Sequence, residues 1–138
     1  MRAVVDPNVA VSAALSPNGA PAAVLLAWLE GQFEMVASPR LIAELDRTLA
    51  YPKIRKRIPQ EDSTALVRLI ERGAVMRDDV VDPPSVSRDA GDDYLIALAR
   101  ASEAVIVSGD GDLLALAPDL PVFAPASFLA WLEVQRRG

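Results

Sequence analysis

The sequence contains neither cysteine nor histidine, and each absence removes a class of chemistry. Without cysteine there is no disulfide and no thiol nucleophile, and without histidine there is no imidazole base and no Ser–His–Asp triad. Zinc sites built from those two residue types are excluded as well. Chemistry must therefore come from carboxylates, hydroxyls, amides, arginines and only two lysines, Lys53 and Lys56.

Long hydrophobic runs and an excess of positive charge are also lacking. The longest apolar stretch, Ala22 to Leu29, is much shorter than the ~18–20 residues that a membrane-spanning helix needs. Near the N-terminus, Asp6 interrupts the apolar core that a secretion signal requires. The 19 acidic and 14 basic residues give a formal charge of −5, which excludes a generally basic nucleic-acid surface but not a local basic patch. We therefore expect a soluble, cytoplasmic protein.

The chain of 138 residues is 51% apolar, enough for one domain with a sizeable core. Short apolar segments, which predict strands, lie at residues 3–5, 33–37, 74–76, 104–107 and 121–123. Segments with helical spacing or start signals lie between them, at residues 21–30, 39–51, 60–72, 94–102 and 113–117, with a short helix from Asn8 or Ser12 and a last helix from Pro125. This alternation predicts an α/β domain with a parallel sheet and right-handed crossovers.

Acidic residues occur where the predicted strands end. Asp6 and Asp110 each follow a strand, Asp92 and Asp93 begin a helix, and Glu44 lies in the helix after the second strand. In an open parallel sheet, ligands bind outside the carboxyl ends of the strands. The pattern therefore predicts one acidic cluster rather than scattered surface charges.

Most of these acids also have a plainer interpretation. Glu44 has arginines one turn away on its own helix and could form an exposed ion pair. Asp92 and Asp93 could cap a helix, and Asp110 could be a turn residue. Asp6 stands apart, because an acid that ends a buried strand is uncommon. For Asp6 we favour a functional role.

Four short motifs, each with at least one acid, occur in order along the chain: Val-Val-Asp-Pro-Asn-Val at 4–9, Ser-Pro-Arg-Leu-Ile-Ala-Glu-Leu at 38–45, Asp-Tyr-Leu-Ile-Ala-Leu-Ala at 93–99, and Val-Ser-Gly-Asp-Gly-Asp-Leu-Leu at 107–114. Together they resemble the motifs of PIN-domain ribonucleases, in particular the VapC-type toxins of bacterial toxin–antitoxin pairs. The chain departs from the family pattern at Pro7, where a serine or threonine is usual. Proline removes both a hydroxyl and a backbone donor there.

The resemblance implies a three-layer α/β/α PIN-like domain over residues 1–138, with a central, mostly parallel five-stranded sheet. It implies that four acids bind metal and act in catalysis: Asp6, Glu44, Asp93 and Asp110. Asp112 is a further candidate ligand, Asn8 and Ser108 would assist by hydrogen bonding, and Asp92 competes with Asp93 for the third position. A cognate antitoxin and a homodimer are implied as well.

A cluster of carboxylates needs a cation. Two like charges about 4 Å apart repel by about 4 kcal/mol at an effective dielectric near 20. With oxygen ligands only, the expected ion is Mg²⁺ or Mn²⁺. We therefore predict an endoribonuclease that hydrolyses RNA phosphodiesters with metal-activated water and leaves a 5′-phosphate and a 3′-hydroxyl. Cleavage through the 2′-hydroxyl would need a general base, which this chain hardly offers.

A basic run follows the helix that carries Glu44, and it consists of Lys53, Arg55, Lys56 and Arg57. One interpretation is an RNA-binding surface that neutralises backbone phosphates beside the metal pocket. The other is a solvated helix end whose cations complement the helix dipole. Aromatic residues make up only 5% of the chain, so base stacking should contribute little.

Two other functions remain as alternatives. Aspartyl-phosphate chemistry also uses an aspartate at a strand end, but it needs a lysine at a later strand end, and none follows Lys56. A PIN-like scaffold or antitoxin-binding module with weak metal affinity would bind its partner but would not cleave RNA in a metal-dependent way.

Overall fold

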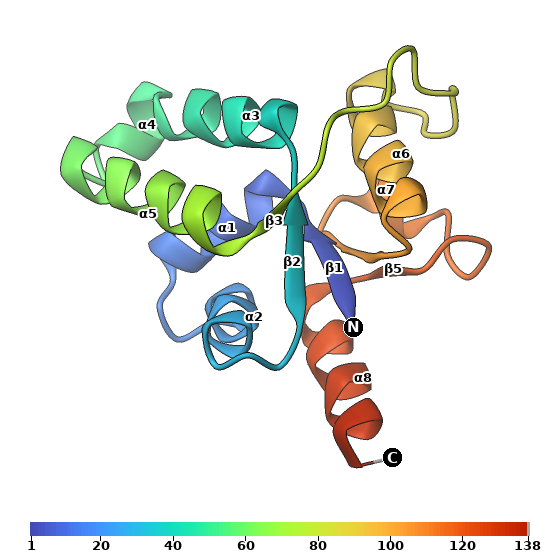
Figure 1. Cartoon of the computed structure of the whole chain (residues 1–138). Coiled ribbons are helices and arrows are strands. Elements are labelled where there is room, and N and C mark those ends of the chain that lie inside the picture. The colour runs from blue at the N-terminus through green and yellow to red at the C-terminus, as the bar shows by residue number, and fades with distance from the viewer. Residues whose placement is uncertain (138) are drawn as a thin grey trace.

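Five parallel strands form the centre of the computed structural model, which describes residues 1–137 (Figure 1). Their order across the sheet is β3 (Val75–Met76), β2 (Glu34–Ala37), β1 (Arg2–Val5), β4 (Val105–Val107) and β5 (Val122–Phe123). Each neighbouring pair runs parallel. The predicted α/β class with a five-stranded sheet is confirmed.

Helices lie on both sides of this sheet, with α1, α3 and α5 on one side and α6 and α7 on the other (Figure 1). The helix that ends the described chain, α8, packs against α2 and β5. The bounds of these elements are α1 Pro7–Leu15, α2 Ala20–Leu29, α3 Pro39–Leu49, α4 Pro52–Arg55, α5 Gln60–Gly73, the 3₁₀ turn η1 Ala90–Asp92, α6 Asp93–Ala101, α7 Gly111–Leu114 and α8 Pro125–Arg137.

Local sequence explains where the helices near the sheet edge begin. The Ser38 hydroxyl accepts a hydrogen bond from the Leu41 amide at 3.2 Å, and Pro39 provides the first helical residue of α3. The Asp6 carboxylate caps α1 in the same way, so this helix begins at Pro7, one residue before the earlier of the two predicted starts. Both caps lie directly after a strand. The strand ends and helix starts therefore meet at one edge.

The core is built from both faces of the sheet. The strand residues Val4, Val36, Ile106 and Val107 are buried, as expected for a parallel sheet covered on both sides. In the core, Phe128 of α8 packs edge-on against Phe33, with ring centroids 5.0 Å apart.

No single described helix is long and apolar enough to cross a membrane. Helices α1 and α2 reach the necessary length and hydropathy only when taken together, and the two are bent by 105° relative to each other.

Strand order determines where a site can form. The chain proceeds outward from β1 to β2 and β3, with α1 to α5 in these connections, and then crosses back to place β4 on the other side of β1. Right-handed crossovers that run in opposite directions put their helices on opposite faces. The helices therefore diverge between β1 and β4. This is the position where open α/β sheets bind ligands, and Asp6 and Ser108 are the residues that follow these two strands.

Two segments differ from the sequence prediction. The basic run, to which the sequence analysis assigned neither helix nor strand, contains part of the short helix α4, because Pro52 can begin a new helix after α3 ends. The predicted helix at 113–117 lies earlier, as α7, because the Asp110 side chain accepts a hydrogen bond from the Asp112 amide and caps the helix there.

Candidate functional site

Asp6 is the buried centre of the acidic site. Its side chain is oriented by two hydrogen bonds, one donated by the Ser108 hydroxyl at 2.7 Å and one by the Asn8 amide at 3.0 Å. Its own amide donates to the Val107 carbonyl at 2.9 Å. Only 4% of the residue is exposed, and this burial raises the pKa of Asp6 although both hydrogen bonds act to lower it. The ends of β1 and β4 thus hold one carboxylate in a fixed orientation.

Asp110 reaches the same place through the turn after β4. Its amide donates to the Ser108 hydroxyl at 3.0 Å, so a single serine contacts both acids. Its Oδ1 accepts the Asp112 amide at 2.8 Å. Ser108, an expected supporting residue, therefore lies between Asp6 and Asp110, whereas Asp112 contributes its backbone to the turn.

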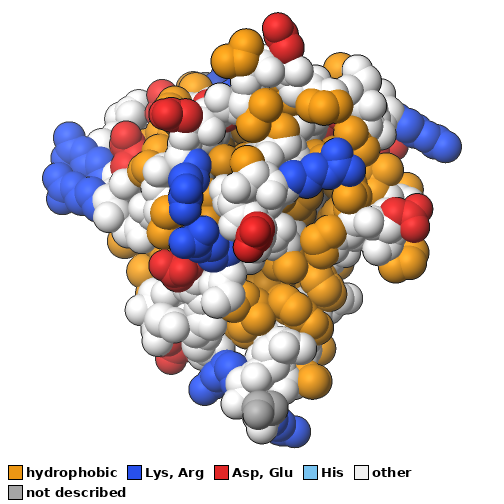
Figure 2. All heavy atoms as spheres, turned by 45° about the vertical axis from the view of Figure 1, so that its right-hand side comes forward, with side chains coloured by type: hydrophobic (Ala, Val, Ile, Leu, Met, Phe, Trp, Pro, Cys, Tyr) orange, Lys and Arg blue, Asp and Glu red, His pale blue; other side chains and the backbone are white. Residues whose placement is uncertain are grey.

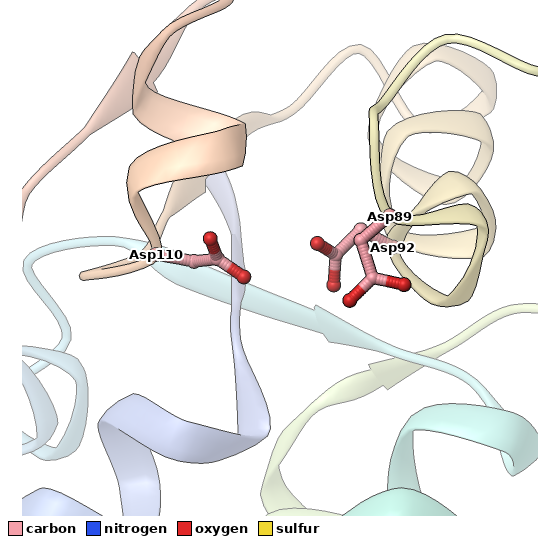
Figure 3. Close-up of side chains that lie close together, drawn as sticks. All are labelled: Asp89, Asp92 and Asp110. Atoms are coloured by element: carbon pink, nitrogen blue, oxygen red, sulfur yellow. The ribbon is translucent and has the colours of Figure 1, made fainter.

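Three carboxylates come close together above this turn: Asp89 and Asp92 from the η1 segment, and Asp110 from the opposite side (Figure 3). One oxygen of each lies within 4.8 Å of one oxygen of the others. Burial raises the pKa of Asp92 to about 7, and the charges of Asp110, Asp89 and Asp6 contribute to the rise. The repulsion that the sequence predicts is therefore present at Asp92.

Asp93, the favoured third ligand in the sequence analysis, is held elsewhere. Its Oδ1 accepts the amides of Val86 and Ser87 at 3.0 and 2.8 Å, and these two hydrogen bonds lower the pKa of Asp93. Successive residues of a helix point about 100° apart, so only one of the adjacent aspartates can face the acidic cluster. The structure brings Asp92 to the cluster and uses Asp93 to anchor the loop that leads to Asp89.

Asp89 is a residue that the sequence analysis did not select. Its Oδ1 accepts the Gly91 amide at 2.9 Å and caps η1. The available signal was the spacing of Asp89 and Asp92, because acids three residues apart lie on the same side of a helical turn. Asp89 therefore both caps η1 and belongs to the acidic cluster.

Glu44 reaches the opposite side of Asp6. It lines a small pocket of about 70 Å³ together with Asp6, Asn8, Asp92 and Tyr94. Its side chain is 29% exposed and also forms an ion pair with Arg47. Both interpretations of Glu44 therefore describe the same side chain: it is paired on its helix and borders the acidic pocket.

The basic run lies beyond the far end of α3. Arg55 donates to the Leu49 carbonyl at 3.4 Å and Arg57 to the Leu15 carbonyl at 3.3 Å, so these arginines contact the last turns of α3 and α1. This arrangement matches the helix-end interpretation for the two arginines. Lys53 and Lys56 are exposed. Glu44 lies in the second turn of α3, whereas Lys53 lies in the next helix, α4.

An open cavity of about 360 Å³ adjoins Asp6 on the side of α1 and α8. Its lining includes Asn8, Ser12, Gly109 and Asp110. The acids thus lie between this cavity and the small pocket at Glu44. All of their donors are oxygen atoms, the ligand type that Mg²⁺ and Mn²⁺ prefer.

Changing the two adjacent aspartates separately should give opposite effects on stability. Asp93→Ala leaves the Val86 and Ser87 amides without their acceptor, so it should lower the free energy of unfolding by ~1–3 kcal/mol in a urea titration. Asp93→Asn keeps an acceptor oxygen and should cost less. Asp92→Asn removes a repelled charge and should stabilise the metal-free chain while weakening Mn²⁺ binding. If Asp93→Asn lost Mn²⁺ binding and Asp92→Asn kept it, the assignment of Asp92 to the acidic cluster would be contradicted.

Stability of the metal-free chain should depend on pH through Asp92. Between its ordinary pKa of 3.8 and the raised value of about 7, the folded chain holds a proton that the unfolded chain has lost. Stability should therefore fall as pH rises through this range and level off above it. Melting temperatures in EDTA at about pH 5 and about pH 8 measure the effect. The Asp92→Asn variant should show a flatter profile than exposed Asp119→Asn; equal profiles would argue against the raised pKa.

Comparison with known proteins agrees with this architecture. Residues 2–112 match the family described as PIN domain. The uncharacterized protein MJ1680 of Methanocaldococcus jannaschii is 29% identical over 119 residues, which cover 84% of this chain and 75% of that protein.

Three solved structures share the fold at low sequence identity. PAE2754 from Pyrobaculum aerophilum has a TM-score of 0.64 at 15% identity and covers 97% of this chain and 90% of its own. VapBC2 from Rickettsia felis, bound to a DNA fragment from its promoter, has a TM-score of 0.63 at 14% identity, and FitAcB from Neisseria gonorrhoeae 0.55 at 20%; each covers 90% of this chain and 98% of its own. The matched segment contains every acid of the cluster, and on this match the chain belongs to the PIN domain family.

Proposed function

We propose that this chain is a metal-dependent endoribonuclease and the toxin component of a toxin–antitoxin pair. The observation that carries the nuclease assignment is the convergence of Asp6, Asp92 and Asp110 at the point where β1 and β4 diverge. These residues are 86 and 18 positions apart in the chain, so their proximity is produced by the fold. Membership of the PIN domain family and the all-oxygen donor set support the same chemistry.

The residues fit a divalent cation. Asp6 is buried, the pKa of Asp92 is raised, and Oδ2 of Asp92 is buried without a hydrogen-bond partner among residues 1–137. Asp6, Asp92 and Asp110 would hold the ion, with Asp89 and Glu44 as further oxygen donors in place of Asp93 and Asp112. When bound, Mg²⁺ or Mn²⁺ would activate water and neutralise charge on the phosphodiester.

The protein residues around the acids would position the reactants. Ser108 holds Asp6 and the amide of Asp110 at once, so it sets the separation of these two acids. The Asn8 amide fixes the second oxygen of Asp6. Pro7 is buried as the first residue of α1, and its missing N–H lies at a helix start, where no intrahelical partner exists for it. The departure from the family pattern at Pro7 is therefore compatible with the helix cap. The cavity beside Asp6 offers space for a nucleotide.

A protein partner forms part of the proposal. The resemblance to VapC-type toxins supports a cognate antitoxin and a homodimer. An apolar area covers part of the face shown in Figure 2. A groove of about 280 Å³ lies between α6, β4 and the residues just before β5. It is lined by Ile96, Ala99, Arg100, Glu103, Ala104, Val105, Ile106, Leu120 and Pro121. Exposed apolar surface such as the area in Figure 2 is typical of protein contacts.

The alternative, a PIN-like scaffold without cleavage, makes a different prediction at the metal. The purified chain should cleave single-stranded RNA with Mg²⁺ or Mn²⁺ and lose this activity in EDTA. Asp6→Asn and Asp92→Asn should each reduce the rate at least about a hundredfold, because each removes a negative charge that would balance the cation. Loss of one preorganised oxyanion-hole donor has an effect of this size in other enzymes. Exposed Asp119→Asn is the matched control. A wild-type chain that binds partner but leaves RNA intact with both metals would favour the scaffold.

The two exposed lysines give a separate test of the RNA path. Replacing Lys53 and Lys56 by glutamine should reduce the slope of log affinity against log salt by about 1.4, or about 0.7 for each phosphate contact with a single strand. The control changes Arg68 and Arg72 on α5 to glutamine and removes the same charge elsewhere. Equal slopes in the two double variants would place the RNA away from α4.

A further inference from the structure

Arg40 lies at the near end of α3, over a residue of the acidic pocket. Its guanidinium carbon is 4.5 Å from the centroid of the Tyr94 ring. Tyr94 is only 6% exposed and lines the small pocket with Asp6, Glu44 and Asp92. The Arg40 guanidinium therefore lies over a buried ring that borders the same pocket as three acids of the site.

The backbone of Arg40 is held in place by the start of α3. Pro39 provides the first helical residue, and the Arg40 amide donates to Oδ2 of Asp79, in the segment after β3, at 2.9 Å. Only the direction in which the side chain leaves the helix is set in this way. The stacked ring then restricts the guanidinium itself.

The guanidinium keeps its hydrogen-bond donors available. The ion pairs found within residues 1–137 join Arg2 to Glu34, Arg47 to Glu44, and both Arg136 and Arg137 to Glu133; Arg40 takes part in none of them. The guanidinium N–H groups of Arg40 also donate to no hydrogen-bond partner within residues 1–137. An exposed arginine that is held over a ring and keeps its N–H donors available suits the oxygens of a phosphate.

The acids and Arg40 lie close enough to Tyr94 for all of them to affect its pKa. Burial raises the pKa of Tyr94, the carboxylates of Glu44 and Asp6 raise it further, and Arg40 lowers it. The phenol thus stays protonated and interacts electrostatically with both the acids and the guanidinium. A polyanion that approaches the acids meets their repulsion, and Arg40 is a cation within the same small region.

We propose that Arg40 binds a backbone phosphate of the RNA next to the cleavage position, and that Tyr94 positions its guanidinium. This inference rests on the proposed nuclease function. Arg40 would contact the substrate directly, whereas Tyr94 would act through Arg40. The near end of α3 then contributes a bidentate phosphate contact that is separate from the lysines at the far end.

The test measures binding of a single-stranded RNA oligonucleotide by fluorescence anisotropy, with Ca²⁺ present and in an Asp6→Asn background that keeps the RNA intact. Arg40→Gln should weaken binding about tenfold, as loss of a charge-assisted hydrogen-bonded contact does, and should lower the salt slope by about 0.7. Arg40→Lys should keep the slope and recover part of the affinity. Arg68→Gln on α5 is the charge-matched control and should leave both unchanged.

Tyr94 needs variants that separate positioning from folding. Tyr94→Phe keeps the ring and should bind RNA as the background does. Tyr94→Leu removes the ring and should bind as weakly as Arg40→Gln, and combining the two changes should weaken binding no further. In the chain with Asp6 intact, Arg40→Gln should raise KM for cleavage while kcat and Mn²⁺ affinity stay within about twofold, the pattern for loss of uniform substrate binding.

Failure of this inference and failure of the proposed function look different. If the chain with Asp6 intact cleaves RNA and Arg40→Gln binds and cleaves like Arg68→Gln, the nuclease assignment stands and the phosphate contact of Arg40 is wrong. If the chain with Asp6 intact cleaves no RNA with Mg²⁺ or Mn²⁺, the proposed function fails and the assignment of Arg40 fails with it.

Discussion

The hydrogen bond from Ser108 to Asp6 is the constraint on which the site depends. It joins residues 102 positions apart, at the ends of two adjacent parallel strands, and leaves a carboxylate buried at the sheet edge. Burial of an acid is unfavourable unless hydrogen bonds or a cation compensate, and here two hydrogen bonds do so only in part, because the pKa of Asp6 stays raised. The folded chain therefore holds a charge that a bound cation would stabilise.

Two further segments bring additional negative charge close to Asp6. The turn after β4 brings in Asp110 through the same serine, and η1 brings in Asp89 and Asp92. Asp93 anchors the preceding loop with two backbone hydrogen bonds, so the arrangement of the cluster relies on an acid outside it. Each further carboxylate at this edge raises the electrostatic cost of the fold in the absence of a cation. Under the proposed function the same carboxylates would hold the ion.

Helix α3 links the site to the surface of the molecule. Its first turn carries Arg40 over Tyr94, its second turn carries Glu44 to the pocket, and its far end leads to the basic run. The arginines of that run contact the carbonyls of helix ends, whereas Lys53 and Lys56 are exposed. Both ends of α3 therefore carry exposed positive charge near the surface.

The sequence by itself determined the α/β class, the five strands, the helix starts at Ser38 and Pro125, and the position of Asp6 and Asp110 at strand ends. These features depend on local properties: apolar runs, capping residues and the placement of proline. Only the tertiary structure placed Asp92 and Asp89 in the cluster, Asp93 on two loop amides, and Arg40 over Tyr94. Those outcomes depend on which way a side chain points from its helix and on what a distant segment places beside it, and spacing along a chain specifies neither.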